Sequence, residues 1–350
     1  MEIDIEEALQ RSDLVFIDVR SPREYEASAI PGSLNIPLFD NREYRLLGIT
    51  YHRMGEHAAR RAALKIVAPK LPGLADAITE ACGDKMPLLY CRRGGMRSLS
   101  LYQVLSLTGI SVLRLKKGYK AYRKLVGKKL ADYKLNFGLI VLHGLTGVGK
   151  TAVLHKLNML GHPTLDLEGL ARHRGSVFGA IGPETPRSQK NFDALLLEQL
   201  DLLQGFQFIF VEGEGRRIGN IYLPPFLFEA MKKGVQVLLT APIKTRVDRI
   251  IEAYRPDELS RQELENLKVA LKSLQNRLGK RKTADLMALL DQADFKAVAE
   301  ILCTDYYDHY YSDSRPESAR FDFNIDAENV SAAAAELVEL AGSLQKKNKE

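Results

Sequence analysis

The segment CRRGGMRS, which begins at Cys91, brings together a nucleophile, three arginines and two glycines. Glycine-rich turns direct backbone N–H groups toward one point, and nearby guanidinium groups and a helix N-terminus favour a thiolate over a thiol. We therefore predict a lowered thiol pKa and a nucleophilic role for this cysteine. The assigned catalytic groups are Cys91, Arg92, Arg93 and Arg97, and the assigned phosphate-binding groups are Gly94 and Gly95.

A buried structural cysteine is the alternative to a reactive one. This alternative is favoured for Cys82, which lies in an apolar helical segment, and for Cys303. It explains Cys91 poorly, because a structural cysteine needs neither arginines nor glycines beside it. Three cysteines cannot all pair with one another, so a disulfide scaffold is excluded and a cytoplasmic location is expected.

The segment GLTGVGKT, residues 144–151, matches the phosphate-binding pattern G-x-x-x-x-G-K-[ST]. An apolar strand pattern precedes it and a helical pattern follows it, as the motif requires. In such a loop the N–H groups bind phosphate, the lysine adds a positive charge, and the Ser/Thr hydroxyl binds Mg²⁺. The motif predicts a phosphate or diphosphate site and does not by itself identify ATP. The assigned residues are Gly144, Gly147, Gly149, Lys150 and Thr151.

An acid, Glu212, ends the predicted strand 208–212. A carboxylate at the end of a neighbouring strand can hold Mg²⁺ beside a P-loop, directly or through water. Glu212 is therefore assigned to phosphate binding and, with Thr151, to a candidate Mg²⁺ site. The alternative is a strand-end carboxylate that pairs with Arg216 or Arg217.

Short apolar strand patterns alternate with helical patterns around both motifs. The expected strands are 14–19, 88–90, 112–115, 139–142, 208–212, 235–240 and 321–325. Strands separated by helices favour parallel α/β sheets over a sandwich. We predict an α/β fold of two domains: residues 1–130 around the cysteine loop, and residues 131–350 around the P-loop with a helical extension over about 255–312.

Composition is typical of a globular protein, because 45% of the 350 residues are hydrophobic and 27% are charged. The formal net charge is +6, and residues 114–134 hold nine Lys or Arg against one acid, which favours a polyanionic partner. No apolar run is long enough to span a membrane and the N-terminus is acidic, so neither a membrane partner nor a signal peptide is expected.

Residues 17–25 (IDVRSPREY), residues 30–37 (IPGSLNIP) and the Cys91 loop together resemble a rhodanese domain. In rhodaneses this cysteine carries sulfur, and sometimes selenium, as a persulfide, and an arginine usually lies five positions after it. Here Arg97 lies six positions after Cys91. The wider loop is similar to those of rhodanese-fold phosphatases, so the expected substrate is a tetrahedral oxyanion that bears a chalcogen.

A rhodanese-like domain followed by a P-loop NTPase-like domain resembles the tRNA 2-selenouridine synthase family over nearly the whole chain. Three further segments carry this resemblance: residues 166–179 (DLEGLARHRGSVFG), 212–219 (EGEGRRIG) and 305–310 (DYYDHY). The first of them is the most specific to the family.

The resemblance implies a two-step transferase reaction at the wobble uridine of tRNA. A geranyl group from geranyl diphosphate is attached to the sulfur of 2-thiouridine, and selenium from selenophosphate then replaces the S-geranyl group to give 2-selenouridine. We expect the Cys91 loop to bind selenophosphate, with Cys91 as a candidate carrier of selenium, and the P-loop to hold the diphosphate of the prenyl donor. Both donors are co-substrates, Mg²⁺ is a candidate cofactor, no tightly bound cofactor is expected, and selenophosphate synthetase is a candidate partner.

Basic clusters are expected to bind the phosphates of tRNA with a steep salt dependence, although each cluster alone is also explained as a solvated surface. The assigned residues are Lys116, Lys117, Lys120, Arg172, His173, Arg174, Arg216 and Arg217, with Arg277, Lys280, Arg281 and Lys282 as a further cluster. Four tyrosines are candidates for stacking on anticodon bases, while helical spacing favours core packing for at least two of them. They are Tyr306, Tyr307, Tyr310 and Tyr311.

Two alternatives stay open. A rhodanese-type sulfurtransferase or a phosphatase, coupled to a nucleotide-binding P-loop domain, would use the same two loops. A phosphatase also needs a general acid, and no acid lies close in sequence to the Cys91 loop. The second alternative is a non-catalytic RNA-binding protein, which would need neither Cys91 nor Lys150.

Overall fold

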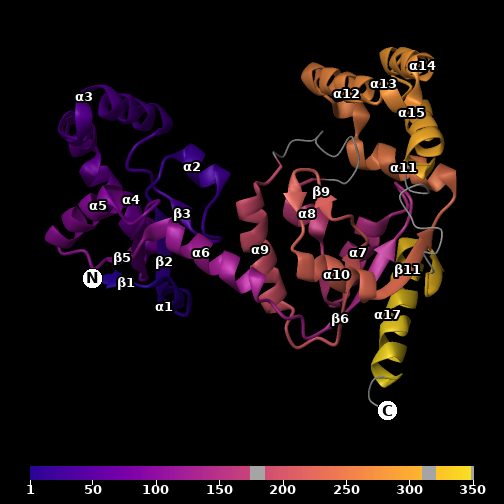
Figure 1. Cartoon of the computed structure of the whole chain (residues 1–350), viewed down its shortest axis with the longest axis horizontal. Helices are drawn as coiled ribbons and strands as arrows, with labels where there is room; N and C mark the ends of the chain where they lie inside the picture. Colours follow the sequence, from indigo (N-terminus) through magenta and orange to yellow (C-terminus); the bar gives the residue numbers. More distant parts are fainter. Residues whose placement is uncertain (174–185, 310–320, 348–350) are drawn as a thin grey trace. The chain divides into compact units, whose positions relative to one another are not determined.

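The computed structural model describes residues 1–173, 186–309 and 321–347 (Figure 1). The chain forms two compact units. Unit 1 comprises Met1–Asp132 with Ser188–Leu197, and unit 2 comprises Tyr133–Arg187 with Glu198–Glu350. Each unit contains a parallel sheet with helices, so the predicted α/β fold in two parts is confirmed. Within the described residues, no helix is both long and apolar enough to cross a membrane.

Unit 1 contains a five-stranded sheet of order β1-β5-β4-β2-β3, in which all neighbours pair in parallel. Its strands are β1 (Glu2–Ile3), β2 (Leu14–Asp18), β3 (Leu34–Asn35), β4 (Met86–Tyr90) and β5 (Leu113–Leu115). Successive residues of a strand face opposite sides of the sheet, and both Leu88 and Leu89 of β4 are fully buried. The central strand is therefore covered on both faces, and the Cys91 loop leaves it at the carboxyl end, where parallel sheets bind ligands.

The helices of unit 1 pack around this sheet. They are α1 (Ile5–Leu9), α2 (Pro22–Ala27), α3 (Asn41–Val67), α4 (Leu71–Cys82), α5 (Met96–Leu107) and α6 (Gly118–Ala131). Leu101 and Leu105 of α5 join Ile78 of α4 and Leu89 of β4 in one buried apolar cluster. This packing fixes α5, whose N-terminus faces the Cys91 loop.

Helix α3 lies largely in solvent. Val67 is its one buried residue, and the helix is interrupted at Gly55, where φ is 83° and ψ is 176°. A capping box starts it, in which the Glu43 N–H donates to the Asp40 carboxylate at 2.7 Å. Because α3 has no apolar stripe, hydrophobic periodicity does not predict it.

Unit 2 contains a second five-stranded parallel sheet, of order β12-β11-β6-β8-β7. Its strands are β6 (Gly138–His143), β7 (Thr164–Leu165), β8 (Phe208–Glu212), β11 (Val235–Thr240) and β12 (Phe323–Asp326), and a separate antiparallel pair is formed by β9 (Arg217–Ile218) and β10 (Ile221–Tyr222). The P-loop follows the central strand β6, and Glu212 ends the neighbouring strand β8. The sheet thus brings the predicted phosphate loop and its partner acid to one edge.

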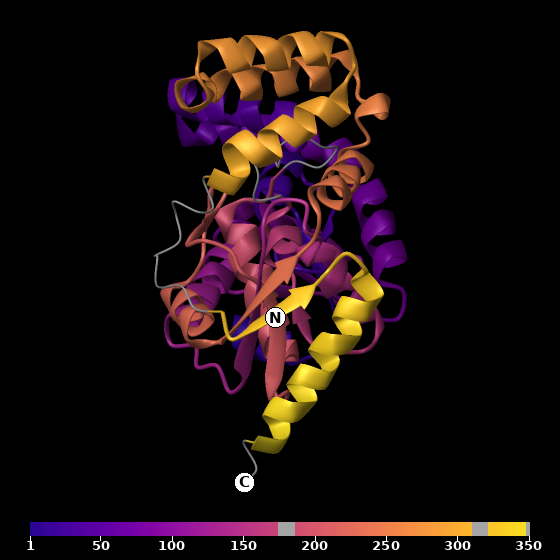
Figure 2. The same cartoon turned by 90° about the vertical axis from the view of Figure 1, so that its right-hand side faces the viewer.

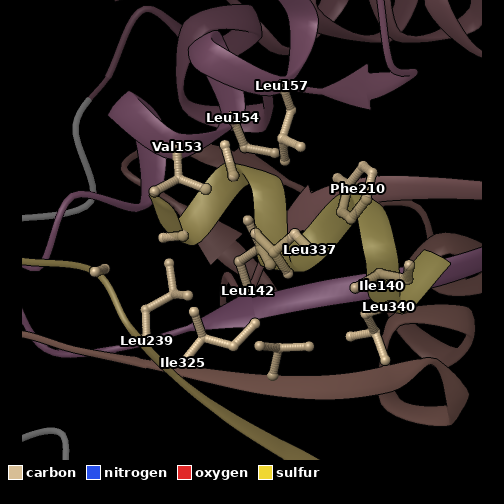
Figure 3. Close-up of a cluster of buried hydrophobic side chains, with 14 of the residues drawn as sticks. Ile140, Leu142, Val153, Leu154, Leu157, Phe210, Leu239, Ile325, Leu337 and Leu340 are labelled. Carbon is tan, nitrogen blue, oxygen red and sulfur yellow. The ribbon is translucent and has the colours of Figure 1, made fainter. Parts of the chain in front are cut away.

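The core of unit 2 joins the sheet to two helices. The helices nearest the sheet in sequence are α7 (Lys150–Met159), α8 (Leu167–Ala171), α10 (Pro225–Lys233), α11 (Ile243–Tyr254) and α17 (Val330–Lys347). Most of α9 (Gln189–Leu202) belongs to unit 1. Figure 3 shows Leu337 of α17 among the side chains of α7 and those of the strands, and all of these residues are buried. The closing helix predicted at the end of the chain is therefore part of the P-loop core.

A group of helices forms an extension at one end of unit 2, drawn in orange in Figure 2. It consists of α12 (Arg261–Ser273), α13 (Gln275–Leu278), α14 (Lys280–Asp291), α15 (Phe295–Leu302) and a π-helical turn, Cys303–Tyr307. Tyr306 and Tyr307 lie in its apolar core, which confirms core packing for two of the four tyrosines. Tyr310 and Tyr311 lie outside the described residues.

Candidate functional site

The sulfur of Cys91 is buried in the loop between β4 and α5, where the residue is 3% exposed. The backbone N–H of Gly95 donates to Sγ at 3.2 Å, and the hydroxyl of Ser98 lies 3.3 Å from Sγ. The sulfur is thus in contact with one N–H donor and one hydroxyl group. The role of Ser98 was missed because the motif was assigned through its cysteine, arginines and glycines, although the first turn of the following helix faces the same point.

The Cys91 loop packs so closely against the start of α6 that two glycines are required. Gly118 has a φ of +53°, and a Cβ atom added to it would lie 2.0 Å from the carbonyl oxygen of Cys91. Gly94 has a φ of +64°, and its Cβ would lie 2.9 Å from the backbone nitrogen of Lys117. The Tyr119 N–H completes the contact by donating to the Cys91 carbonyl oxygen at 2.9 Å. The backbone of α6 therefore sets the shape of the loop.

The three arginines of the loop have different environments. Arg92 and Arg93 are exposed, whereas Arg97 is half-buried, forms an ion pair with Glu24, and lies 4.9 Å from the centroid of the Tyr44 ring. Burial disfavours the charge of Arg97, but the hydrogen bond and charge of Glu24 outweigh it and raise the guanidinium pKa. Burial likewise opposes the charge of Glu24, and Arg97 more than offsets this and lowers the carboxyl pKa. Arg97 is a fixed cation beside the loop, and sequence reasoning missed both residues that hold it.

The aspartate and arginine of the rhodanese-like motif after β2 have a structural role. Asp18 and Arg20 are buried, and Arg20 Nε donates to Asp18 Oδ1 at 2.9 Å. Arg20 also donates to the carbonyl oxygen of Ser28 at 2.5 Å, and its guanidinium lies 4.4 Å from the centroid of the Tyr119 ring. Because the Tyr119 N–H holds Cys91, this buried pair connects β2 to the support of the reactive loop.

The lysines assigned to tRNA in unit 1 lie in the segment that contacts the Cys91 loop. Lys117 and Lys120 are exposed, and Lys116 forms an ion pair with Asp4 at 2.8 Å. The Lys120 N–H donates to the carbonyl oxygen of Arg92 at 3.0 Å. Their charges therefore add to those of the exposed loop arginines.

Helix α3 carries a set of exposed cations that sequence reasoning missed. We name as the α3 basic surface its exposed residues Arg42, Arg45, Arg53, Arg60, Arg61 and Lys65. Tyr51 and Met54 on the same helix are 54% and 71% exposed. Cations together with an exposed aromatic ring are typical of RNA-binding surfaces. Since Tyr44 of this helix contacts Arg97, the surface begins at the Cys91 loop.

The P-loop joins β6 to α7 and turns on glycines that adopt positive φ. They are Gly144, Gly147 and Gly149, with φ of 156°, 80° and 100°. The Lys150 ammonium donates to the carbonyl oxygen of Gly144 at 3.2 Å, so it lies across the loop. These features agree with the loop shape that the phosphate-binding motif predicts.

Two arginines of α11 bind the backbone of the P-loop. Arg246 Nε donates to the carbonyl oxygen of Thr146 at 2.9 Å, and Arg249 Nη1 donates to that of Val148 at 2.5 Å. The remaining guanidinium nitrogens of Arg246 donate to the Asp308 carboxylate at 2.6 and 2.9 Å. These contacts span about 100 residues of sequence, which is why no local pattern signalled them, and they fix the loop before a ligand binds.

Glu212 is fully buried and lies beside Thr151, whose hydroxyl donates to its Oε1 at 2.6 Å. The N–H of Glu168 donates to the other carboxylate oxygen at 3.4 Å. Burial, followed by the charges of Glu168 and Asp166, raises the pKa of Glu212 well above its ordinary value. The structure thus brings together the two residues assigned to Mg²⁺.

A further acid, Glu214, lies beside this pair and was not assigned from the sequence. Burial and the charge of Glu168 raise the pKa of Glu214 to about 7, although Lys150 lowers it. A hydroxyl and carboxylates are ligands that Mg²⁺ accepts while keeping waters and substrate phosphates. Among the described residues no three His, Cys, Asp or Glu side chains form a ready metal cluster, so Thr151 and Glu212 would supply few protein ligands.

The basic residues assigned to tRNA in unit 2 come from three segments of the sequence, 172–174, 216–217 and 277–282. Arg172, Arg216 and Arg217 are exposed, and Arg174 lies outside the described residues. His173 packs directly against Gly219, where a Cβ would lie 2.5 Å from the imidazole. Arg217 also donates to the Gly219 carbonyl oxygen rather than to Glu212. In the extension, Lys282 pairs with Asp305 at 2.7 Å.

Comparison with known proteins agrees with this two-part arrangement. Residues 3–125 match the family model of the rhodanese-like domain, and residues 137–339 match that of the tRNA 2-selenouridine synthase AAA domain. The second match alone covers more than half of the chain.

Several relatives share most of the chain. A tRNA 2-selenouridine synthase of Hydrogenovibrio crunogenus is 33% identical over 349 residues, covering 92% of this chain and 95% of that protein. One of Nitrosomonas europaea is 35% identical over 258 residues, covering 71% of this chain and 65% of that protein, and in the Nitrosomonas eutropha protein the match spans 64% of its length. By both the domain match and these identities, the chain belongs to the tRNA 2-selenouridine synthase family.

Proposed function

We propose that this chain converts 2-thiouridine at the wobble position of tRNA to 2-selenouridine, by S-geranylation with geranyl diphosphate and then selenium transfer from selenophosphate. The observation that carries the proposal is that the chain holds two glycine-rich loops with different side chains around them. One contains a buried thiol with N–H and hydroxyl partners, and the other contains an ammonium group beside a buried acid. Membership of the family supports the same reaction.

In the first step the sulfur of 2-thiouridine attacks C1 of the geranyl group. The S–C1 bond forms, the C1–O bond breaks, and diphosphate leaves with the electron pair. Lys150 and the N–H groups of the P-loop stabilise the charge that develops on the diphosphate. Mg²⁺ held by Thr151 and Glu212 would supply further positive charge to this leaving group.

In the second step the Cys91 thiolate attacks the phosphorus of selenophosphate. The P–Se bond breaks, selenide leaves with its electron pair, and water later hydrolyses the S–P bond to release phosphate. Selenide attacks C2 of the S-geranylated uridine and displaces geranylthiolate. Attack on phosphorus is preferred to capture of selenium on Cys91, because the latter would release phosphite and so reduce phosphorus.

The test is nucleoside mass spectrometry on 2-thiouridine tRNA incubated anaerobically with both donors. We expect 2-selenouridine with the wild type and S-geranyl-2-thiouridine when selenophosphate is omitted. Cys91→Ala is expected to lower selenium transfer at least about 10³-fold while geranylation continues. Cys82→Ala, at a buried thiol outside the loop, is the matched control.

Two results would contradict the proposal. Unmodified tRNA together with hydrolysis of a phosphate ester would favour the phosphatase alternative, and a Cys91 persulfide formed from a sulfur donor would favour the sulfurtransferase. Intact-protein mass spectrometry of trapped enzyme distinguishes a phosphorus adduct on Cys91 from a selenium adduct.

A further inference from the structure

An apolar cavity lies between α11 and the helical extension and reaches the P-loop. Thr146 contributes the P-loop to its wall, and Ile250, Tyr254, Leu267 and Phe295 are among the side chains that line the rest. The described residues around it are almost all aliphatic or aromatic.

Helix α11 connects the phosphate cradle to this cavity. Arg246, Ile250 and Tyr254 are spaced four residues apart, so they lie on one face of the helix. The first binds the Thr146 carbonyl oxygen and the other two line the cavity. With a rise of about 1.5 Å per residue, this face extends about 12 Å from the loop.

We infer that this cavity binds the hydrocarbon chain of the donor whose diphosphate occupies the P-loop, and that its walls set the length of the chain transferred. The inference rests on the proposed function. A ligand that fills both sites must join an anionic head to an apolar tail, as an allylic diphosphate does. A nucleotide base fits the cavity poorly, because the lining provides few groups for the hydrogen bonds that orient polar ligands.

Two substitutions test the walls in opposite directions. Ala299 and Leu267 both line the cavity and are buried. Ala299→Leu fills space and should shift transfer from geranyl toward dimethylallyl diphosphate, and Leu267→Ala opens space and should shift it toward farnesyl diphosphate. Each buried methylene changes the affinity for an apolar chain about fourfold. The ratio of transfer from the two donors should therefore change at least about tenfold in each variant. The ratio is measured within each variant, so a partial loss of folded protein does not alter it.

Matched controls lie on the same helices, outside the cavity lining: Ala297→Leu on α15 and Val269→Ala on α12, where Val269 is 69% exposed. Both should keep the wild-type donor ratio. A second readout is calorimetric binding to the wild type, in which geranyl diphosphate should bind at least about 100-fold more tightly than inorganic diphosphate.

The outcomes separate the two proposals. Unchanged donor ratios in both cavity variants, with normal geranylation by the wild type, would overturn the cavity assignment and leave the proposed function intact. If the wild type transfers no prenyl group, the proposed function fails, and calorimetry then decides the cavity: equal affinity for geranyl diphosphate and inorganic diphosphate refutes it.

Discussion

The Cys91 loop and the P-loop share one construction, because each follows a buried parallel strand, turns on glycines and opens a helix. Their side chains differ. The Cys91 loop places a sulfur among an N–H donor and a hydroxyl, whereas the P-loop places Lys150 near Thr151 and a buried carboxylate. Both backbones have the form of an anion-binding loop, so under the proposed function the neighbouring side chains decide whether the bound anion is attacked or only held.

The two loops are also held differently. The Cys91 loop rests on the backbone of α6 at Gly118, and the P-loop is held by the side chains Arg246 and Arg249. Backbone contacts leave no room for an added atom, while a side-chain contact can be removed without a clash. Mutations should therefore damage the first loop more severely.

The largest effect is expected for Gly118→Ala. The added Cβ would meet the Cys91 carbonyl oxygen at 2.0 Å in a residue with φ of +53°, so we expect a loss of about 4 kcal/mol or more in the free energy of unfolding of unit 1. Selenium transfer should fall with it, while diphosphate binding by unit 2 persists. Urea denaturation checks the stability. Gly127→Ala in the same helix, where a Cβ meets open space, is the control and should stabilise by up to about 1 kcal/mol.

A smaller loss is expected for Arg246→Gln. The change leaves the half-buried Asp308 carboxylate without its ion pair, so unfolding free energy should fall by about 2–3 kcal/mol and geranylation by about 10–100-fold. Selenium transfer to tRNA that is already S-geranylated should stay near the wild-type rate. Arg255→Gln, at an exposed pair directly after the same helix, should change neither. An equal loss of geranylation and of selenium transfer would contradict the assignment of the two steps to different loops.

We expect the stability of unit 2 to depend on pH, because of the half-buried carboxyl group of Glu214 near the P-loop. Because the pKa of Glu214 is raised to about 7 in the folded chain, Glu214 favours folding below its ordinary value near 4.5 and loses this contribution as pH rises toward 7 and above. The loss should be about 1–2 kcal/mol after allowing for water contact. Urea denaturation between pH 5 and pH 8 should show a shallower slope for Glu214→Gln. An identical slope would show that the group titrates normally.

The smallest effects concern the α3 basic surface. Replacing Arg53 by alanine should weaken tRNA binding a few-fold and reduce the slope of log affinity against log salt by about 1. Arg60 pairs with Glu56 at 2.6 Å, so Arg60→Ala should change the slope less. Binding measured between 50 and 200 mM salt checks both. An unchanged slope in Arg53→Ala would exclude this residue from the tRNA contact.

Strong local patterns predicted much of the fold. Strands β6, β8 and β11 and both glycine loops were anticipated, because continuous apolar runs followed by glycines are short-range signals. Helix α3 was missed because an almost wholly exposed helix carries no apolar stripe.

The supports of the site were harder to predict than its motifs. Cys91, Lys150, Thr151 and Glu212 lie in recognisable segments, and the structure places Thr151 beside Glu212. By contrast, Arg246 reaches the P-loop from about 100 residues away, and the pairing of Glu24 with Arg97 joins residues 73 positions apart. Such contacts depend on tertiary packing, and local hydrophobic periodicity in a single sequence does not reveal them.

The order of strands in the two sheets has a consequence for synthesis of the chain. In unit 1, the first strand β1 gains its partner β5 only ~110 residues later. In unit 2, one edge of β11 gains its partner β12 only ~80 residues later, a delay of about 4–16 s at the usual 5–20 residues per second. During these intervals strand edges are open to pairing with other nascent chains, so chains truncated before β5 or before β12 should aggregate more readily than the full chain.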